Sequence, residues 1–264
     1  YTITLTIRGY TGSGYVTETC QATFTASAFP ADEDWYFDSV SGNNANNGLT
    51  SGTAKENLTG FSFWPTEDAY VHYHFARGGT YTYALGNRGI TRFSAYGSGA
   101  KPILNFSGTG FLLNVSNNNQ VFEDVVMSDI HIVTSGENAM RLGVAGGLTN
   151  SGINDIYLDN VKITRNAPAE DHDYACFQLS GSTVGVGYWN VEMDTGTNYI
   201  GAEYLGGGGS WRFFVGCKFL NGRGYTAGPG RQTGHNIYMG SENHQLVRYC
   251  ELGTGAGGRY FNIN

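Results

Sequence analysis

The chain has 264 residues, of which 40 are glycine and 14% are charged, and its formal net charge is −7. This composition argues against a nucleic-acid partner, which would require a basic surface to replace counterions on the phosphates. No run of about eighteen apolar residues is present, so we expect no membrane span. Abundant Gly, Asn, Ser, Thr and Tyr with few Lys and Glu residues are typical of an all-β protein with many turns.

The first predicted element is a β-hairpin. Two alternating runs, YTITLTIRG and YVTETCQATFTA, are joined by YTGSG, and a lone hairpin is only marginally stable in water. The runs resemble the last two strands of a PKD or other immunoglobulin-like module. The resemblance implies that residues 1–30 end a β-sandwich module whose earlier strands lie upstream. The alternative is a hairpin that packs on the main domain.

The second predicted element is a turn at residues 42–52, GNNANNGLTSG, between the runs DWYFDSV and FARGGTY. Asparagine and glycine readily adopt left-handed and turn conformations. Because strand-like runs frame the stretch on both sides, we interpret it as a fixed turn that begins a repetitive domain over residues 31–264. It is therefore not expected to be a free linker.

Internal repeats follow from about residue 110 to the end of the chain. One set of strand-like segments aligns with steps of 31, 30, 26 and 33 residues at Ile130, Val161, Val191, Cys217 and Cys250. A second, interleaved set aligns with steps of 29, 37, 26 and 34 residues at Leu113, Leu142, Leu179, Leu205 and Met239. Two short strands for each turn of about thirty residues indicate a solenoid, in which stacked turns bury one continuous core.

The period favours a parallel β-helix over a leucine-rich repeat, which has a shorter period, and over a propeller, which needs four strands in about forty residues. From about residue 35 the chain resembles the right-handed parallel β-helices of the pectate-lyase-like superfamily. The resemblance rests on YFDSVSGNNANNGLTSG, FARGGTYTY and FSAYGSGAKPIL. The expected fold is all-β, a right-handed parallel β-helix with coils of about 26–37 residues, and we expect it to continue beyond the last residue.

One strand column of the β-helix is a candidate glycan-binding surface. If the aligned Leu and Met residues point inward, their neighbours point outward and form a ladder with a rise of about 4.8 Å per coil. Tyrosine rings offer apolar faces to sugars, and arginine and glutamine offer hydrogen bonds. The ladder comprises Arg141, Gln178, Tyr204 and Tyr238. The alternative is that these are ordinary outward residues of a tyrosine-rich sheet.

Two long turns that enter this column are candidate catalytic loops, because function often lies in loops on a rigid scaffold. Lyases of uronic acids need a cation to neutralise the sugar carboxylate and a base to remove the C5 proton. Arg231 could neutralise the carboxylate, His235 or Tyr238 could act as the base, and Arg223 could bind substrate. Calcium is the candidate cofactor, with oxygen ligands from Glu170, Asp171 and Asp173. A hydrolase would instead need two carboxylates about 5–10 Å apart, and the local choices are Asp171, Asp173, Glu203 and Glu242.

The four cysteines, Cys20, Cys176, Cys217 and Cys250, lack the spacing of a zinc site or a redox pair. Cys217 and Cys250 occupy equivalent places in successive coils, within reach of a disulfide, but stacked free thiols are the favoured expectation. Sequons occur at Asn57, Asn105 and Asn114, and glycosylation at them is left open.

Three functions are therefore considered. The first is an extracellular, secreted or virion-surface protein that interacts with a polysaccharide, either as a lyase or as another depolymerase. The second is a non-catalytic structural or adhesive component of a phage virion or a cell surface, for which a homotrimer or larger assembly is expected. The third is a secreted glycoprotein, which only the sequons support.

Overall fold

A computed structural model of the chain describes residues 2–10, 15–23, 33–58, 71–84, 92–107, 113–115, 121–122, 125–134, 140–144, 152–165, 177–180, 183–194, 203–206, 212–220, 235–239, 245–253 and 259–263. The chain divides into two compact units, residues 1–31 and residues 32–264. In the first unit, β1 (Thr2–Tyr10) pairs antiparallel with β2 (Tyr15–Thr23). The hairpin pattern is thus confirmed, whereas its place at the end of an immunoglobulin-like module stays a prediction.

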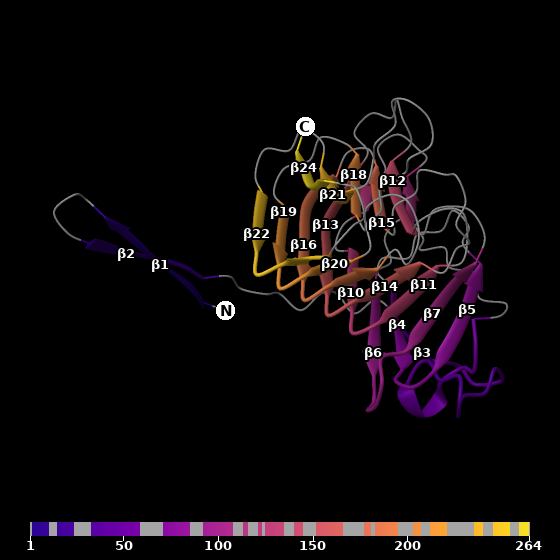
Figure 1. The fold of residues 1–264 in the computed structure, drawn as a ribbon. Coiled ribbons are helices and arrows are strands. Elements are labelled where there is room, and N and C mark those ends of the chain that lie inside the picture. Colours follow the sequence, from indigo (N-terminus) through magenta and orange to yellow (C-terminus); the bar gives the residue numbers. More distant parts are fainter. Residues whose placement is uncertain are drawn as a thin grey trace, which may run out of the picture. The chain divides into compact units, whose positions relative to one another are not determined.

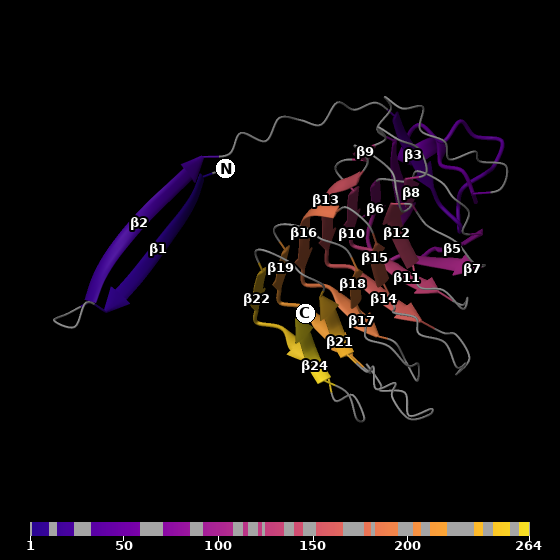
Figure 2. The same ribbon diagram turned by 90° about the horizontal axis from the view of Figure 1, so that it is seen from above.

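The second unit consists of three parallel sheets (Figures 1 and 2). The nine-stranded sheet comprises β3 (Glu33–Phe37), β4 (Val71–Ala76), β6 (Arg92–Tyr96), β9 (Val121–Phe122), β10 (Val125–Ser128), β13 (Gly152–Asp159), β16 (Thr183–Trp189), β19 (Arg212–Val215) and β22 (Gln245–Arg248). The seven-stranded sheet comprises β5 (Thr80–Ala84), β7 (Ile103–Ser107), β11 (His131–Thr134), β14 (Lys162–Arg165), β17 (Glu192–Asp194), β20 (Lys218–Leu220) and β23 (Glu251–Leu252). The six-stranded sheet comprises β8 (Leu113–Val115), β12 (Met140–Val144), β15 (Phe177–Ser180), β18 (Glu203–Gly206), β21 (His235–Met239) and β24 (Arg259–Ile263).

From β10 onward the chain visits the three sheets in turn, and each strand pairs in parallel with the strand one coil away. This is the expected right-handed parallel β-helix, in agreement with the handedness of parallel crossovers. The described residues contain no α-helix and one short 3₁₀ helix, η1 (Ser51–Thr53). No helix in the described part of the chain is long and apolar enough to cross a membrane.

From β6 onward each coil contributes strands to all three sheets, so the prediction of two strands per repeat was wrong. The segments that were read as one strand bend in the middle, where a residue adopts a left-handed backbone conformation. The chain then passes from the nine-stranded to the seven-stranded sheet. The bending residues have φ between 52° and 66°, and they are Asp129, Asn160, Asn190, Gly216 and Tyr249.

The aligned columns of the repeat are confirmed by backbone pairing. Backbone N–H groups of one coil donate to backbone carbonyl groups of the coil before it, at 2.7–2.9 Å, and the accepting residues are Ile130, Val161, Val191 and Cys217. In the six-stranded sheet the partners are Leu113, Leu142, Leu179, Leu205 and Met239. The inward face of the nine-stranded sheet carries a continuous column of buried side chains, which comprises Tyr73, Phe93, Met127, Leu158, Tyr188 and Phe214.

Residues 38–58 cover the first edge of the nine-stranded sheet. Tyr36 of β3 donates its N–H to the Gly48 carbonyl at 2.7 Å and accepts from the Lys55 N–H at 3.0 Å. The Lys55 ammonium donates to the Asn46 carbonyl at 2.6 Å and thereby ties the turn together. An uncovered strand edge would invite pairing with other chains. The stretch predicted to be a fixed turn is therefore one, and it also closes the edge of the β-helix.

Candidate functional site

The outward surface of the nine-stranded sheet carries two groups of side chains that the core does not require. The first, here called the Asp–His cluster, is formed by Asp34 of β3 with His72 and His74 of β4. The second, here called the aromatic row, lies several coils away and is formed by Tyr157, Trp189, Phe213 and Leu246. Both groups follow from the alternation of inward and outward residues along a strand.

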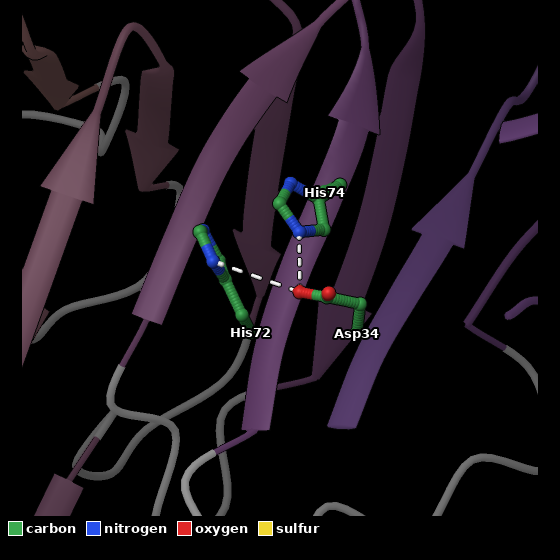
Figure 3. Close-up of side chains that lie close together, drawn as sticks. All are labelled: Asp34, His72 and His74. Carbon is green, nitrogen blue, oxygen red and sulfur yellow. Dashed lines mark hydrogen bonds and ion pairs between the residues drawn. The ribbon is translucent and has the colours of Figure 1, made fainter. Parts of the chain in front are cut away.

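The Asp–His cluster is assembled by strand register. Asp34 pairs with His72, and Tyr36 pairs with His74, so these side chains emerge on the same side of two adjacent strands. Figure 3 shows the Asp34 carboxylate directed at both imidazoles. Its Oδ1 lies 2.8 Å from Nε2 of His74 and 3.9 Å from Nδ1 of His72. The side chains of Asp34, His72 and His74 are 46%, 35% and 15% exposed, so solvent reaches the cluster from the carboxylate side.

Neighbouring side chains fix the orientation of the His74 ring. Nδ1 of His74 lies 2.9 Å from the Ser94 hydroxyl of β6, opposite the nitrogen that contacts Asp34. The Tyr36 ring stacks on the imidazole with centroids 4.5 Å apart and an interplanar angle of 12°. The His72 ring lies against the same His74 imidazole, with ring centroids 3.9 Å apart. The imidazole of His74 is thus in contact with two other rings and has a polar partner at both nitrogens.

The electrostatic environment keeps His72 neutral. Burial lowers its pKa to about 4, and the nearby His74 and Arg92 act in the same direction, whereas Asp34 raises the pKa. Arg92 is a buried residue in register with His72 on β6. Burial also raises the pKa of Tyr36, with a further contribution from the Asp34 carboxylate.

Two kinds of chemistry are open to this cluster. Two imidazoles and a carboxylate whose ligand atoms all lie within 4.8 Å of one another can bind a transition metal. Alternatively, Ser94, His74 and Asp34 form a hydrogen-bonded chain that is formally similar to a catalytic triad. Acyl transfer also needs preorganised hydrogen-bond donors for an oxyanion, and here the backbone groups of β4 and β6 are used in the parallel ladder. The geometry therefore favours metal binding.

The aromatic row lies on β13, β16, β19 and β22. Tyr157 pairs with Gly187, Gly187 with Phe213, and Phe213 with Leu246, so they form one outward line across four coils. The Phe213 ring covers Gly187, where a β-carbon would lie 2.2 Å from Cζ of the ring. Trp189 is the next outward residue on β16. Trp189, Phe213 and Leu246 are 50%, 38% and 52% exposed.

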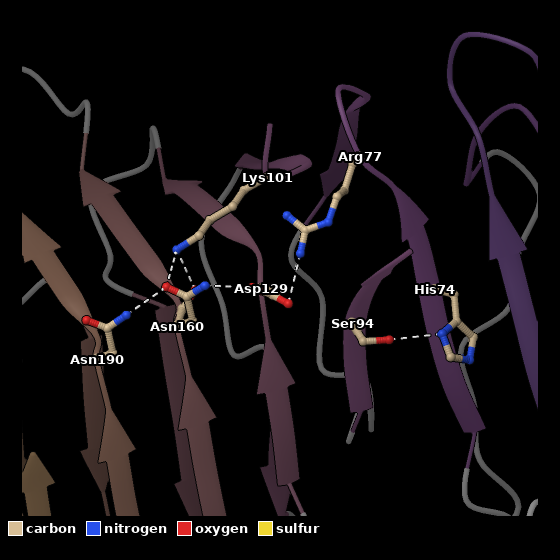
Figure 4. A network of polar contacts seen from close by, with 7 residues as sticks. All are labelled: His74, Arg77, Ser94, Lys101, Asp129, Asn160 and Asn190. Carbon is tan, nitrogen blue, oxygen red and sulfur yellow. Dashed lines mark hydrogen bonds and ion pairs between the residues drawn. The ribbon is translucent and has the colours of Figure 1, made fainter. Parts of the chain in front are cut away.

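A polar ladder runs beside these groups along the bend between sheets (Figure 4). The Asn160 amide donates to Oδ1 of Asp129 at 2.6 Å and accepts from the Asn190 amide at 3.0 Å. The Lys101 ammonium donates to the same Asn160 oxygen at 2.9 Å. Arg77 pairs with Asp129 at 2.8 Å. Because these groups satisfy one another along the bend, we assign the ladder to stability and not to a binding site.

The sequence-predicted site residues divide into two groups. The predicted glycan ladder is in register in the six-stranded sheet, through the pairs Arg141–Gln178, Gln178–Tyr204 and Tyr204–Tyr238. His235, one of the two candidate bases, begins β21, and Glu203 begins β18. The remaining candidates lie outside the described residues: Glu170, Asp171, Asp173, Arg223, Arg231 and Glu242. Their predicted roles stay predictions.

Sequence reasoning missed the Asp–His cluster. The signal was present as alternation in VHYHF and DWYF, which places His72 and His74 on one face of a strand and Asp34 and Tyr36 on one face of another. Nothing in the sequence says that these two strands are neighbours.

The expectation for the cysteines is confirmed, since Cys217 and Cys250 are free thiols.

Comparison with known proteins assigns neither a family nor a function to the chain. No protein-family model and no curated protein matches the chain. Among solved structures it is similar to a GH136 lacto-N-biosidase from Eubacterium ramulus, at 14% identity and with a TM-score of 0.30. The similarity covers 83% of this chain and 51% of that one, so the chain spans about half the length of that enzyme. The likeness is too weak to extend that enzyme's activity to this chain.

Proposed function

We propose that the protein is an extracellular or surface-displayed β-helix that binds a polysaccharide. The observation that carries this proposal is the aromatic row, which presents Trp189, Phe213 and Leu246 to solvent on a rigid sheet. Large apolar side chains of this kind are usually buried, and a group of them on a surface marks an interaction site. Aromatic rings offer flat apolar faces, and these suit the C–H faces of sugar rings.

The surroundings of the row favour a sugar over an apolar protein partner. Trp189 lies in register between Asp159 and Val215, and Val215 in turn pairs with Arg248, so a carboxylate and a guanidinium flank the row. Ligand sites commonly combine apolar walls with a few polar groups that fix orientation. Sugars match this combination because each ring has an apolar face and a rim of hydroxyl groups.

The test is binding to a panel of neutral and acidic polysaccharides by calorimetry and by retardation in glycan-containing native gels. We expect Trp189→Ala and Phe213→Ala to weaken binding of the recognised glycan at least tenfold. Val40→Ala is the matched control, because Val40 is an exposed apolar residue, 79% accessible, in the turn that covers β3. If no glycan binds, or if these two variants bind as tightly as the wild type, the proposal is wrong.

Lyase activity is part of the proposal and has its own test. Arg231 would neutralise a uronate carboxylate, His235 or Tyr238 would remove the C5 proton, and calcium would bind at Glu170, Asp171 and Asp173. The Arg141, Gln178, Tyr204 and Arg223 side chains would bind the same substrate. Cleavage of an acidic polysaccharide by lyase chemistry gives unsaturated products that absorb ultraviolet light. We expect Arg231→Ala and His235→Ala to abolish this signal without loss of binding at the aromatic row.

A non-catalytic structural or adhesive role is the second candidate, and the ordered ladders on the surface favour it. Besides the asparagine ladder, ion pairs join successive coils at Lys162–Glu192, 2.7 Å, and Lys218–Glu251, 3.2 Å. Such coil-to-coil contacts stiffen a solenoid. This role predicts a stable homotrimer or larger assembly in light scattering and no cleavage of any glycan in the panel. A monomer that cleaves a glycan would exclude it.

A further inference from the structure

We propose that Asp34, His72 and His74 bind a divalent transition-metal ion, for which zinc is the best match. The site lies on β3 and β4, whereas the aromatic row lies on β13 to β22, so the two sites are separate along the β-helix. The proposal does not depend on glycan binding.

The positions of the ligand atoms suit a small metal ion. Zinc bonds of about 2.0–2.1 Å in a tetrahedral arrangement place neighbouring ligand atoms about 3.3 Å apart. Here the Asp34 Oδ1 atom lies 2.8 Å from one imidazole nitrogen and 3.9 Å from the other, on either side of that value. All three atoms lie within 4.8 Å of one another. Small rotations of the side chains would bring them to coordination distance, with no change in the backbone.

The supporting shell is also of the kind that metal-binding histidines have. A ligating imidazole usually donates its other N–H to an oxygen, which fixes the ring. When Nε2 of His74 binds the ion, Nδ1 carries the proton and donates to the Ser94 hydroxyl at 2.9 Å. The hydroxyl can accept or donate, so the same contact serves the metal-free and the metal-bound protein. The stacked Tyr36 ring holds the plane of the imidazole.

The ligand set indicates which ions fit. Calcium needs six to eight oxygen ligands, and the cluster offers one carboxylate. Two imidazoles and one carboxylate suit zinc, cobalt(II) or iron(II). Three protein ligands leave a coordination position for water or for an oxygen of a bound molecule. Arg92, whose backbone is in register with His72 on β6, carries a positive charge that opposes a nearby cation. It would equally favour an anionic oxygen at the open position.

The experiment is a zinc titration of the full chain in competition with a chromophoric chelator, followed by the visible spectrum with cobalt(II). We expect one ion per wild-type chain and a cobalt spectrum of low coordination number with nitrogen and oxygen ligands. Asp34→Asn and His72→Gln should each weaken zinc binding by more than about 100-fold, because loss of a ligand exceeds the 10–100-fold effect of a supporting residue. Ser94→Ala should show that smaller effect.

The matched control is His131→Gln, which removes a half-buried outward imidazole that contacts Thr164 on the seven-stranded sheet. We expect this variant to bind zinc as the wild type does. Circular dichroism in the presence of a chelator establishes that each variant is folded, and Ser94→Ala replaces any variant that is not. The proposal is overturned if the wild type binds no zinc at micromolar concentration. It is also overturned if the folded Asp34→Asn, His72→Gln and Ser94→Ala variants bind as tightly as the control.

Discussion

The polar ladder at the bend between sheets allows a prediction of which substitution at Asn160, glycine or alanine, lowers the free energy of unfolding more. Asn160 combines two properties: it adopts φ of +52°, and its side chain makes three hydrogen bonds to Asp129, Lys101 and Asn190. Asn160→Gly removes the three hydrogen bonds but accepts the backbone conformation. Asn160→Ala removes the same bonds and keeps a β-carbon in the left-handed region, which asparagine tolerates better than alanine does.

The magnitudes follow from the geometry. Three partly exposed hydrogen bonds at about 0.5–1 kcal/mol each amount to about 1.5–3 kcal/mol for Asn160→Gly. A β-carbon in the left-handed region costs about 1–2 kcal/mol, which exceeds the gain of about 0.4–1 kcal/mol from the lower unfolded-state entropy of alanine. Alanine at residue 160 should therefore be less stable than glycine, which reverses their usual order in regular secondary structure.

Gly216 supplies the matched control. It occupies the equivalent bend one coil beyond Asn190, with φ of +66°, and a β-carbon there would have only contacts at 4.0 Å. Gly216→Ala thus reports the backbone cost alone, since no side-chain bonds are lost. The assay is urea denaturation followed by circular dichroism, with midpoints and slopes compared among the variants. The difference between Asn160→Gly and Asn160→Ala should match the cost of Gly216→Ala, and if Asn160→Gly leaves the free energy of unfolding unchanged, the ladder contributes nothing and the reasoning fails.

Three further outcomes are expected. Gly187→Ala should displace the Phe213 ring, because the added β-carbon would clash with that ring. Glycan binding should then weaken as much as it does in Phe213→Ala. Unchanged binding would show that the position of the ring is irrelevant. Burial raises the pKa of Cys217 to about 12. Thiol labelling at pH 8, followed by mass spectrometry, should therefore modify the half-buried Cys250 before Cys217, and equal labelling rates at these two cysteines would refute this. His72 has a folded pKa of about 4 against 6.5 unfolded, so the unfolded state takes up a proton first as the pH falls. Stability should decline between about pH 6.5 and 4, by no more than about 2 kcal/mol because the side chain is 35% exposed, and His72→Gln in metal-free buffer should lose this part of the decline.

The repeat could be predicted because each coil carries its own copy of the packing pattern. Ile130, Val161, Val191 and Cys217 are buried in register, as their spacing indicated. The bend within each segment was missed, although a residue that favours it directly precedes each aligned apolar residue: Asp129, Asn160 and Asn190. Asparagine and aspartate tolerate the left-handed conformation. Their recurrence once per coil could therefore have indicated a third sheet.

The surface groups could not be predicted in the same way. The Asp–His cluster needs β3 and β4 to be neighbours in one register, and Asp34 and His72 are separated by a long segment whose length follows no repeat. The aromatic row depends on which of two alternating faces points out. A shift of one residue would exchange the faces, because the side-chain period of a strand is two.

Sequence by itself determined the solenoid, its period and the residues that stack in its core, because burial of an apolar column is repeated in every coil. It also determined that residues 42–52 form a fixed turn, through the conformational freedom of asparagine and glycine. Tertiary structure alone decided which outward residues meet across strands. Lateral contacts between coils depend on strand register, and register is a property of the pairing that no single strand contains.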